Sequence, residues 1–249
     1  MKKEFPNQHL GTGCHQNSGR QSEGCMHCSV RNLFLLSALS DGELHILNRE
    51  RTSINLKAGD PLYHVGTAPQ GLLCLSAGKI KLEKDNLNGG KQIISLYKPS
   101  EFIGFTDLLG QTLYTSSAIA LENSTVCFIP KLHFNQVLQS NQMLALRVIE
   151  YLAAEISKIV ERSSGLTQKH MRARLADAIL YTYERYNHPN NNEIQVALKR
   201  SDLAALSNMT TANAIRTLSE FIKDKHIEVQ GRKIKILDFT ALRKISQLG

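Results

Sequence analysis

The sequence predicts an α+β protein in which an N-terminal all-β sandwich or roll is followed by a long helix and a C-terminal winged helix-turn-helix. Three observations support this prediction: short β-rich runs between turn residues, one long helix with a heptad repeat, and a basic last third. Of the 249 residues, residues 1–166 contain 16 basic and 14 acidic side chains, whereas residues 167–249 contain 14 and 8. Most of the net charge of +8 therefore lies in the last third, which favours a polyanionic partner there.

Composition argues against a membrane-spanning or secreted protein. No stretch reaches 18 consecutive apolar residues, and the N-terminal sequence lacks the apolar core of a secretory signal. Five cysteines, an odd number without an export signal, indicate reduced thiols or metal ligands rather than a disulfide framework. We therefore expect a cytoplasmic protein without a membrane partner.

Turn residues and composition divide the chain into four segments. Residues 1–24 are rich in Gly, Ser, Asn and Gln and are expected to form a flexible arm. The β-roll domain is expected over 25–140, a dimerisation helix and hinge over 141–165, and the winged helix-turn-helix domain over 166–249. Within the roll, Ser40 is expected to cap a short helix that ends near Asn48. The predicted strands include Gly71–Leu75, Lys79–Glu83, Gln92–Tyr97 and Thr125–Ile129.

Residues 141–162 have the apolar spacing of a helix that can pair with a second copy of itself. The heptad seam is formed by Leu146, Ile149, Ala153, Ile156 and Val160. Val148, Leu152 and Ile159 lie outside this seam and are expected to face the β-roll. A single buried amphipathic helix is the alternative, since three heptads are short. Ser163-Ser164-Gly165 is expected to break the helix and act as a hinge.

The last third contains two short helices joined by a tight turn. A helix from about Gln168 to Tyr186 comes first, and Ser201 is then expected to cap the first short helix. Asn208-Met209 forms the turn and Thr210 caps the second helix, which ends near Lys223. Residues 227–237 are predicted to form a hairpin with a basic tip, and a small helix closes the chain. This order of elements is a winged helix-turn-helix.

The N-terminal residues of the second short helix are expected to enter the major groove of DNA. Arg216 can donate two hydrogen bonds to guanine, and Asn213 can pair with adenine. The helix N-terminus and the basic hairpin can hold phosphates. Thr210 could instead be only a cap, and Arg216 could pair with Glu220 one turn away. The residues expected to contact double-stranded DNA are Arg200, Ser201, Thr210, Thr211, Asn213, Arg216, Arg232 and Lys233.

Six segments resemble the Crp/Fnr superfamily of bacterial transcription regulators. They are KAGDPLYHVG (57–66), GLLCLSAGKIKL (71–82), FIGFTDLL (102–109), STVCFIP (124–130), SDLAALSNMTTANAIRTLSEF (201–221) and GRKIKILD (231–238). The resemblance covers residues of about 25–249 and implies that the β domain is a double-stranded β-roll, a jelly roll of the cyclic-nucleotide-binding type. It also implies a homodimer on a pseudo-palindromic site with half-sites about 34 Å apart. RNA polymerase is the expected protein partner. Ala212 stands where relatives usually carry a DNA-reading Glu, so a different or looser half-site is expected.

The resemblance raises cyclic AMP as a ligand, and the sequence argues against it. The cyclic-nucleotide pocket of the family needs a Glu for the ribose and an Arg for the phosphate. Phe105 and Tyr114 stand at these two positions. A buried phosphate without a cation is unfavourable, so cyclic AMP binding is not expected.

The cysteines nominate a redox cofactor. The oxygen-sensing Fnr branch of the family ligates a [4Fe–4S] cluster with N-terminal cysteines and one cysteine in the β-roll. Cys25 and Cys28 match two of the N-terminal ligands, and Cys127 matches the distant one. The third N-terminal ligand should lie six residues after Cys28, where Phe34 stands, so Cys14 is the available replacement. Cys74 is expected to be a core residue.

Other cofactors stay open at this point. Haem could take an axial ligand from Met26, His27 or His64, or from the cysteine pair. Zinc could bind Cys25 and Cys28 together with Cys14 and a histidine. Reversible oxidation of the Cys25–Cys28 pair needs no metal, and a protein without any cofactor is a further alternative.

The sequence therefore favours a DNA-binding regulator, not an enzyme, that senses redox state, oxygen, nitric oxide or haem iron. A thiol- or metal-dependent redox enzyme is one alternative, although no catalytic motif of the common hydrolase, nucleotide-binding or zinc-protease types occurs. A ligand-binding adaptor without DNA affinity is another. That reading predicts that the basic hairpin residues Arg232, Lys233 and Lys235 are dispensable.

Overall fold

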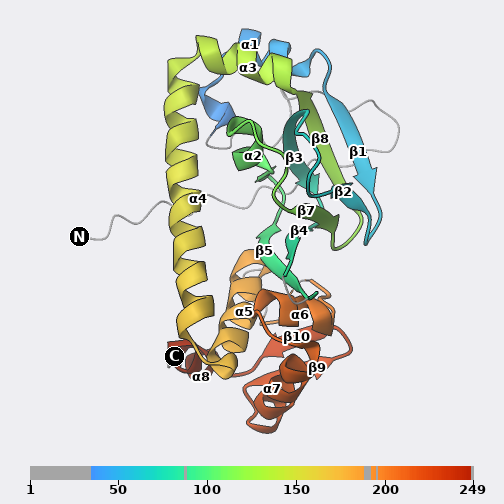
Figure 1. Cartoon of the computed structure of the whole chain (residues 1–249), viewed down its shortest axis with the longest axis vertical. Coiled ribbons are helices and arrows are strands. Elements are labelled where there is room, and N and C mark those ends of the chain that lie inside the picture. The colour runs from blue at the N-terminus through green and yellow to red at the C-terminus, as the bar shows by residue number, and fades with distance from the viewer. Residues whose placement is uncertain (1–34, 87–88, 188–191, 195, 248–249) are drawn as a thin grey trace, which may run out of the picture.

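The computed structural model describes residues 35–86, 89–187, 192–194 and 196–247. Two lobes lie one above the other, and a single long helix, α4, runs down one side of both (Figure 1). The upper lobe contains the β-roll and the lower lobe contains the helix-turn-helix. The predicted α+β architecture is thus confirmed.

The β-roll consists of two four-stranded antiparallel sheets. Their orders are β1-β8-β3-β6 and β2-β7-β4-β5. The strands are β1 Thr52–Leu56, β2 Pro61–Tyr63, β3 Gly71–Ala77, β4 Ile80–Asp85, β5 Lys91–Tyr97, β6 Phe102–Ile103, β7 Ser117–Ala120 and β8 Ser124–Pro130. Apolar side chains from both sheets, among them Leu75, Ile80 and Val126, are fully buried together. Burial of this shared apolar face holds the two sheets together.

Short helices cover the outer face of the first sheet. They are the 3-10 helix Leu36–Ala38, α1 Asp41–Asn48, α2 Phe105–Leu109 and α3 Lys131–Ser140. Ser40 caps α1 as predicted: its hydroxyl accepts from the Glu43 amide, and the Glu43 carboxylate accepts from the Ser40 amide at 2.8 Å. Leu44 and Leu47 of α1 are fully buried against β3, β8 and α3. The apolar side chains buried between these helices, the first sheet and α4 form what we call the outer cluster, which includes Leu44, Cys74, Phe102, Phe105 and Val148.

The long helix α4 spans Gln142–Gln168, so the predicted break at Ser163-Ser164-Gly165 is wrong. The end of the helix is held by contacts that override the low helix propensity of glycine. Arg162 donates to the carbonyl oxygens of Ile94 at 2.5 Å and Ile93 at 3.0 Å, both in β5. Lys169 and His170 have extended backbone angles and form the junction with the next helix.

Only the upper half of the second apolar strip of α4 packs against the roll. Val148 is buried in the outer cluster, and Leu152 is half-buried beside it. The side chain of Ile159 is 51% exposed, so its predicted place against the roll is wrong. Ile159 therefore lies on a side of α4 that the roll leaves open, although Arg162, three residues later, still contacts β5.

The lower lobe has the predicted winged helix-turn-helix order. Its elements are α5 Met171–Tyr186, α6 Arg200–Leu206, α7 Thr211–Lys223, β9 Ile227–Gln230, β10 Lys233–Ile236 and α8 Phe239–Gln247. Phe221 of α7 is its largest fully buried side chain. The predicted cap at Ser201 is wrong, because α6 begins at Arg200. The carboxylate of Asp202 accepts from the Lys199 amide at 3.0 Å and takes the capping role.

The two lobes share a continuous apolar core at β5. Ile93 and Leu96 of this strand are fully buried in the same cluster as α5, α6 and α7. Arg185 of α5 forms an ion pair with Glu101 at 2.5 Å, and Tyr186 donates to the Tyr97 carbonyl at 3.0 Å. The position of the helix-turn-helix is therefore fixed by the β4–β5 hairpin in this conformation. Over the described ranges, no helix is long and apolar enough to cross a bilayer.

Candidate nucleic-acid interface and sensor residues

The turn between α6 and α7 fixes the direction of the second helix. Asn208 has a φ of 49°, in the left-handed region that asparagine tolerates better than most residues. Met209 donates its amide to the Ala204 carbonyl at 3.0 Å, which closes the turn. The buried face of α7 carries Ala214, Thr217, Leu218 and Phe221. Its opposite face carries Thr211, Ala212, Ile215, Arg216 and Ser219, all exposed.

The N-terminus of α7 is open at the surface. The hydroxyl of Thr210 accepts from the Asn213 amide at 3.3 Å, which confirms the predicted cap. Because an isolated helix leaves its first amides unpaired, this end of the helix can receive a phosphate. Asn213 is half-buried, and its side-chain amide lies 3.4 Å from the Met171 sulfur of α5.

Arg216 projects from the exposed face of α7. The alternative pairing of Arg216 with Glu220 does not form, because Arg172 of α5 takes both nearby carboxylates. Arg172 lies 2.8 Å from Glu220 and 2.6 Å from Asp224, and its hydrogen bond lowers the pKa of Asp224. Within the described parts of the chain, Arg216 makes no side-chain hydrogen bond or ion pair. Its guanidinium is therefore available to a ligand.

The hairpin β9–β10 lies beside α6 and forms the wing. Gly231, with a φ of 59°, and Arg232 make its two-residue turn. Arg200 donates to the Gly231 carbonyl at 2.9 Å, so it ties the wing to α6. Arg232 and Lys233 are exposed, and Lys233 lies 3.1 Å from Glu193. Arg200 was predicted to contact DNA, and the hydrogen bond seen here joins it to the turn of the wing.

A buried ion-pair network joins the β-roll to the first helix of the motif. Lys81 of β4 lies 2.8 Å from Asp202 of α6 and 2.7 Å from Glu83, and Lys91 also pairs with Glu83. Burial opposes the charged form of Lys81, but the hydrogen bonds to Asp202 and Glu83 raise its pKa overall. Burial likewise opposes the charged form of Glu83, and hydrogen bonds from Lys81 and Lys91 lower its pKa overall.

Asp202→Ala should destabilise the protein more than the loss of an ordinary helix cap does. The change removes the cap of α6 and one partner of buried Lys81, at a cost of about 2–3 kcal/mol in the free energy of unfolding. Asp238→Ala is the matched control, because Asp238 caps α8 by accepting from the Ala241 amide and belongs to no ion pair described here. It should cost about 1 kcal/mol in denaturant unfolding. Equal losses would contradict an energetic role for the Lys81 contact.

Cys127 lies in β8 directly opposite Cys74 of β3. Cys74 is buried in the outer cluster, as predicted for a core residue, and Cys127 is half-buried at its edge. Arg51 places a guanidinium nitrogen 3.2 Å from the Cys127 sulfur. Cys14, Cys25, Met26, His27 and Cys28 lie outside the described residues. In the described part of the chain, no three His, Cys, Asp or Glu side chains form a group that could hold a metal.

Aromatic side chains fill the part of the roll where a cyclic nucleotide would need polar partners. The rings of Tyr63 and Tyr114 stack in parallel with centroids 3.5 Å apart, and both are buried. Burial raises the pKa of Tyr114 to about 12, so this side chain is neutral at physiological pH. Phe105 is buried in the outer cluster. His64 is the candidate haem ligand that lies within the described residues. It is exposed and directly follows β2, which belongs to the sheet that does not contain Cys127.

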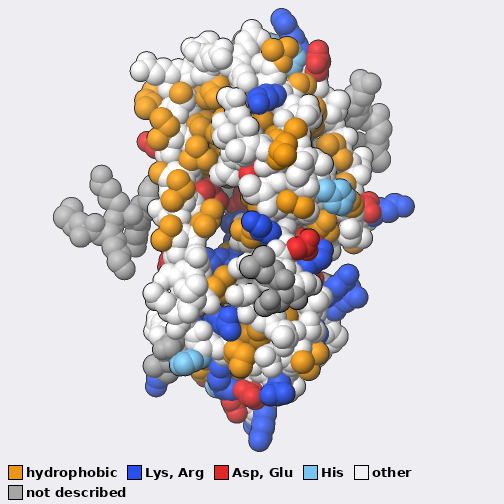
Figure 2. All heavy atoms as spheres, viewed as in Figure 1, with side chains coloured by type: hydrophobic (Ala, Val, Ile, Leu, Met, Phe, Trp, Pro, Cys, Tyr) orange, Lys and Arg blue, Asp and Glu red, His pale blue; other side chains and the backbone are white. Residues whose placement is uncertain are grey.

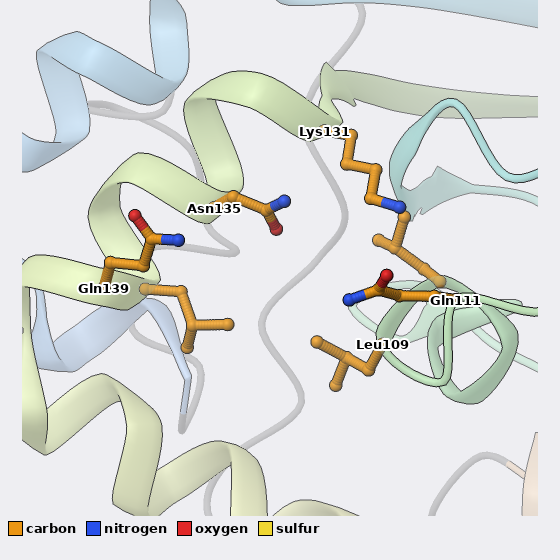
Figure 3. Close-up of a pocket in the computed structure, with 7 residues that line it drawn as sticks. Leu109, Gln111, Lys131, Asn135 and Gln139 are labelled. Atoms are coloured by element: carbon orange, nitrogen blue, oxygen red, sulfur yellow. The ribbon is translucent and has the colours of Figure 1, made fainter.

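A shallow pocket of about 200 Å³ lies outside the roll, between the end of α2 and one face of α3 (Figure 3). Lys131, Asn135 and Gln139 of α3 face Leu109 and Gln111 across it. Lys131 is the one cationic side chain among the residues that line it, and no carboxylate lines it. The pocket therefore lacks the paired charges that the family uses for a cyclic nucleotide.

Two family descriptions match the chain. Residues 53–141 match "Cyclic nucleotide-binding domain", and residues 173–245 match "Crp-like helix-turn-helix domain". An antiparallel roll of this type joined by a long helix to a winged helix-turn-helix defines a DNA-binding transcription regulator. The chain belongs to the Crp/Fnr family of such regulators.

Relatives of known function cover nearly the whole chain. The chain is 26% identical over 235 residues to the "Anaerobic regulatory protein" of Haemophilus influenzae, covering 92% of this chain and 90% of the relative. It is 25% identical to the "Fumarate and nitrate reduction regulatory protein" of Escherichia coli, with 92% of each chain covered. The structure of FixK2 from Bradyrhizobium japonicum superposes with a TM-score of 0.70 at 16% identity, covering 78% of this chain and 96% of that one, and shows the shared fold.

Two features of the candidate DNA interface were not predicted from the sequence. Arg172 was not expected to neutralise Glu220, because the two residues lie 48 positions apart and meet only in the folded lobe. Ile215 was not singled out, although its position, four residues after Thr211, places it on the same helix face. Its side chain is 47% exposed and lies beside Thr211 and Arg216, which are candidates for DNA contact.

Proposed function

We propose that this regulator acts in the cytoplasm as a homodimer that binds a pseudo-palindromic DNA site, contacts RNA polymerase, and responds to oxygen or redox state. A [4Fe–4S] cluster held by Cys14, Cys25, Cys28 and Cys127 is the proposed sensor. The names of the relatives, which refer to anaerobic regulation and to fumarate and nitrate reduction, support this class of signal.

The environment of Cys127 is the observation that carries the sensor proposal. A cysteine that served only as core would be expected to be buried as Cys74 is, whereas Cys127 is half-buried and reachable. The Arg51 guanidinium lies 3.2 Å from the Cys127 sulfur, so this sulfur has a polar neighbour at the edge of the roll. The donor chemistry at this position therefore fits a cluster ligand. A bound cluster would supply a redox-active centre.

Chain length allows the N-terminal cysteines to reach Cys127. The described chain starts at Leu35, which is buried in the outer cluster against which Cys127 packs. Cys28 precedes Leu35 by seven residues, and an extended chain of that length spans up to about 25 Å. This length would be enough for Cys28 to approach the outer cluster, at whose edge Cys127 lies.

The outer cluster offers a route from Cys127 to the long helix. Phe102 and Phe105 belong to this cluster, and both rings contact Tyr151 of α4, with centroids 6.2 Å and 5.6 Å away. Val148 of the same helix is also buried in it. Ligation at Cys127 would restrain β8 and the packing of α4 on the roll. A change in that packing would alter how two α4 helices pair, and so the separation of the two α7 helices.

Anaerobic reconstitution with iron and sulfide tests the sensor. The wild-type protein should bind about four irons and four sulfides per chain and show a broad charge-transfer absorption. Cys127→Ser should lose the cluster, and Cys74→Ala, a change at the opposite cysteine, should keep it. Circular dichroism of both variants shows whether they are folded. A sharp Soret band would indicate haem instead, stoichiometric zinc would indicate a zinc site, and a full cluster in Cys127→Ser would contradict the assignment of Cys127.

A further inference from the structure

Ile215 is an apolar residue on the exposed face of α7. This face would lie toward the bases if α7 enters the major groove as proposed. The other large apolar residues in the middle of this helix, Leu218 and Phe221, are buried in the lobe, whereas Ile215 is 47% exposed on the opposite side. Its neighbours on that face, Thr211, Ala212 and Ser219, have shorter side chains. Ile215 therefore projects beyond them beside Arg216.

The exposed face of α7 carries no carboxylate in its first two turns. Residues 210–219 contain no Asp or Glu, and the first carboxylate, Glu220, is held by Arg172 at 2.8 Å. A cytosine amino group in the major groove is best recognised by a carboxylate, and a thymine methyl group by an apolar side chain. The chemistry of this face thus suits thymine better than cytosine.

We propose that Ile215 is a specificity-determining residue that contacts the C5-methyl group of a thymine, next to the base pair bound by Arg216. The inference rests on the proposed insertion of α7 into the major groove, and is independent of the proposed cofactor. Apolar contact with the methyl group removes exposed surface from both partners. It also gives the exposed isoleucine a role that packing within the chain does not supply.

Ile222 provides a matched control on the same helix. It is 43% exposed and lies seven residues after Ile215, which places it on nearly the same face. The rise of the helix puts it about 10 Å farther along the axis, beyond the N-terminal residues that touch base edges. Truncation of Ile222 therefore removes similar apolar surface without removing the proposed base contact.

The experiment uses the full-length protein in the state that binds DNA and an operator obtained by selection from random duplexes. Each thymine of the half-site is replaced in turn by deoxyuridine, which removes the methyl group and keeps every hydrogen-bonding atom. Replacing the contacted thymine in one half-site should lower wild-type affinity about fourfold, and replacing it in both half-sites should lower it tenfold or more. Ile215→Ala should bind the thymine and uracil duplexes equally, and Ile222→Ala should discriminate as the wild type does.

The outcomes separate this inference from the proposed function. If no duplex is selected, the proposed DNA recognition fails as well. If an operator is selected and every uracil replacement is neutral, Ile215 does not contact a thymine methyl group. Discrimination that persists in Ile215→Ala would assign the methyl contact to another residue and overturn the proposal. Thermal unfolding of both alanine variants should match the wild type, because neither side chain is buried.

Discussion

Ile149→Glu combined with Ile156→Glu is expected to convert the protein to a monomer and to lower its affinity for a two-half-site operator by about 10²–10⁴-fold. The two side chains are 62% and 60% exposed in the single chain. They lie one heptad apart, so in a parallel pair of α4 helices each meets its own counterpart. Four glutamates in such a seam would be desolvated without partners, which opposes association.

The whole seam has the exposure that a dimer interface requires. Leu146, Ile149, Ile156 and Val160 are between 48% and 62% exposed, and Ala153 is exposed as well. Hydrophobic side chains gather along α4 in the view of Figure 2. An apolar stripe of this length on a helix normally faces another surface. The dimer itself is a proposal that the substitution tests directly.

Light scattering after size-exclusion chromatography gives the oligomeric state, and gel mobility shift gives the operator affinity. Leu132→Glu is the control, because Leu132 is 74% exposed and apolar but lies on α3. It should leave a dimer with unchanged affinity. A double variant that still forms a dimer would show that a surface other than α4 holds the two chains together.

Local patterns predicted much of the fold because they act between residues close in sequence. The capping box of Ser40 and Glu43 and the cap at Thr210 each involve residues three positions apart, and both formed as expected. The strand runs alternate with turns over the same short range. The order of elements followed from these local signals and from the heptad spacing in α4.

The failures occurred where a distant residue decided the outcome. Gly165 stays helical since Arg162 is bound to the carbonyl oxygens of β5, 68 and 69 residues earlier. Asp202 rather than Ser201 caps α6, and the same carboxylate serves Lys81, which lies 121 residues away. The Lys199–Asp202 cap is local, but the contacts of Arg162 with β5 and of Asp202 with Lys81 have no signature in the local sequence.

Of the candidate site, the sequence likewise predicted the features that depend on local periodicity and missed those that depend on distant contacts. The exposed face of α7 follows from helical periodicity, so Thr211 and Arg216 could be named in advance. The pairing of Glu220 with Arg172 could not, because it depends on how α5 crosses α7. If Arg216 contacts DNA as proposed, this pairing matters because it keeps the Glu220 carboxylate from competing for Arg216.

Arg216→Ala is expected to lower the affinity for the selected operator about a hundredfold or more, with little effect on binding to unrelated DNA. A bidentate arginine–guanine contact is worth about 1–3 kcal/mol, and a dimer loses two of them. Because Arg216 has no ion pair within the described chain, its removal should leave the unfolding free energy within about 0.5 kcal/mol of wild type. Fluorescence anisotropy with specific and scrambled duplexes measures the two affinities.

Two arginine controls distinguish base recognition from charge. Arg216→Lys keeps the positive charge but cannot form the planar two-bond contact, so it should also lose most of the specific affinity. Arg243→Ala removes an exposed arginine from α8 and should leave specific binding nearly unchanged. If Arg216→Lys binds the operator as wild type does, the residue acts through its charge on a phosphate. Sequence reading would then rest on the remaining exposed residues of α7, and the uracil replacements described above would show which thymines they contact.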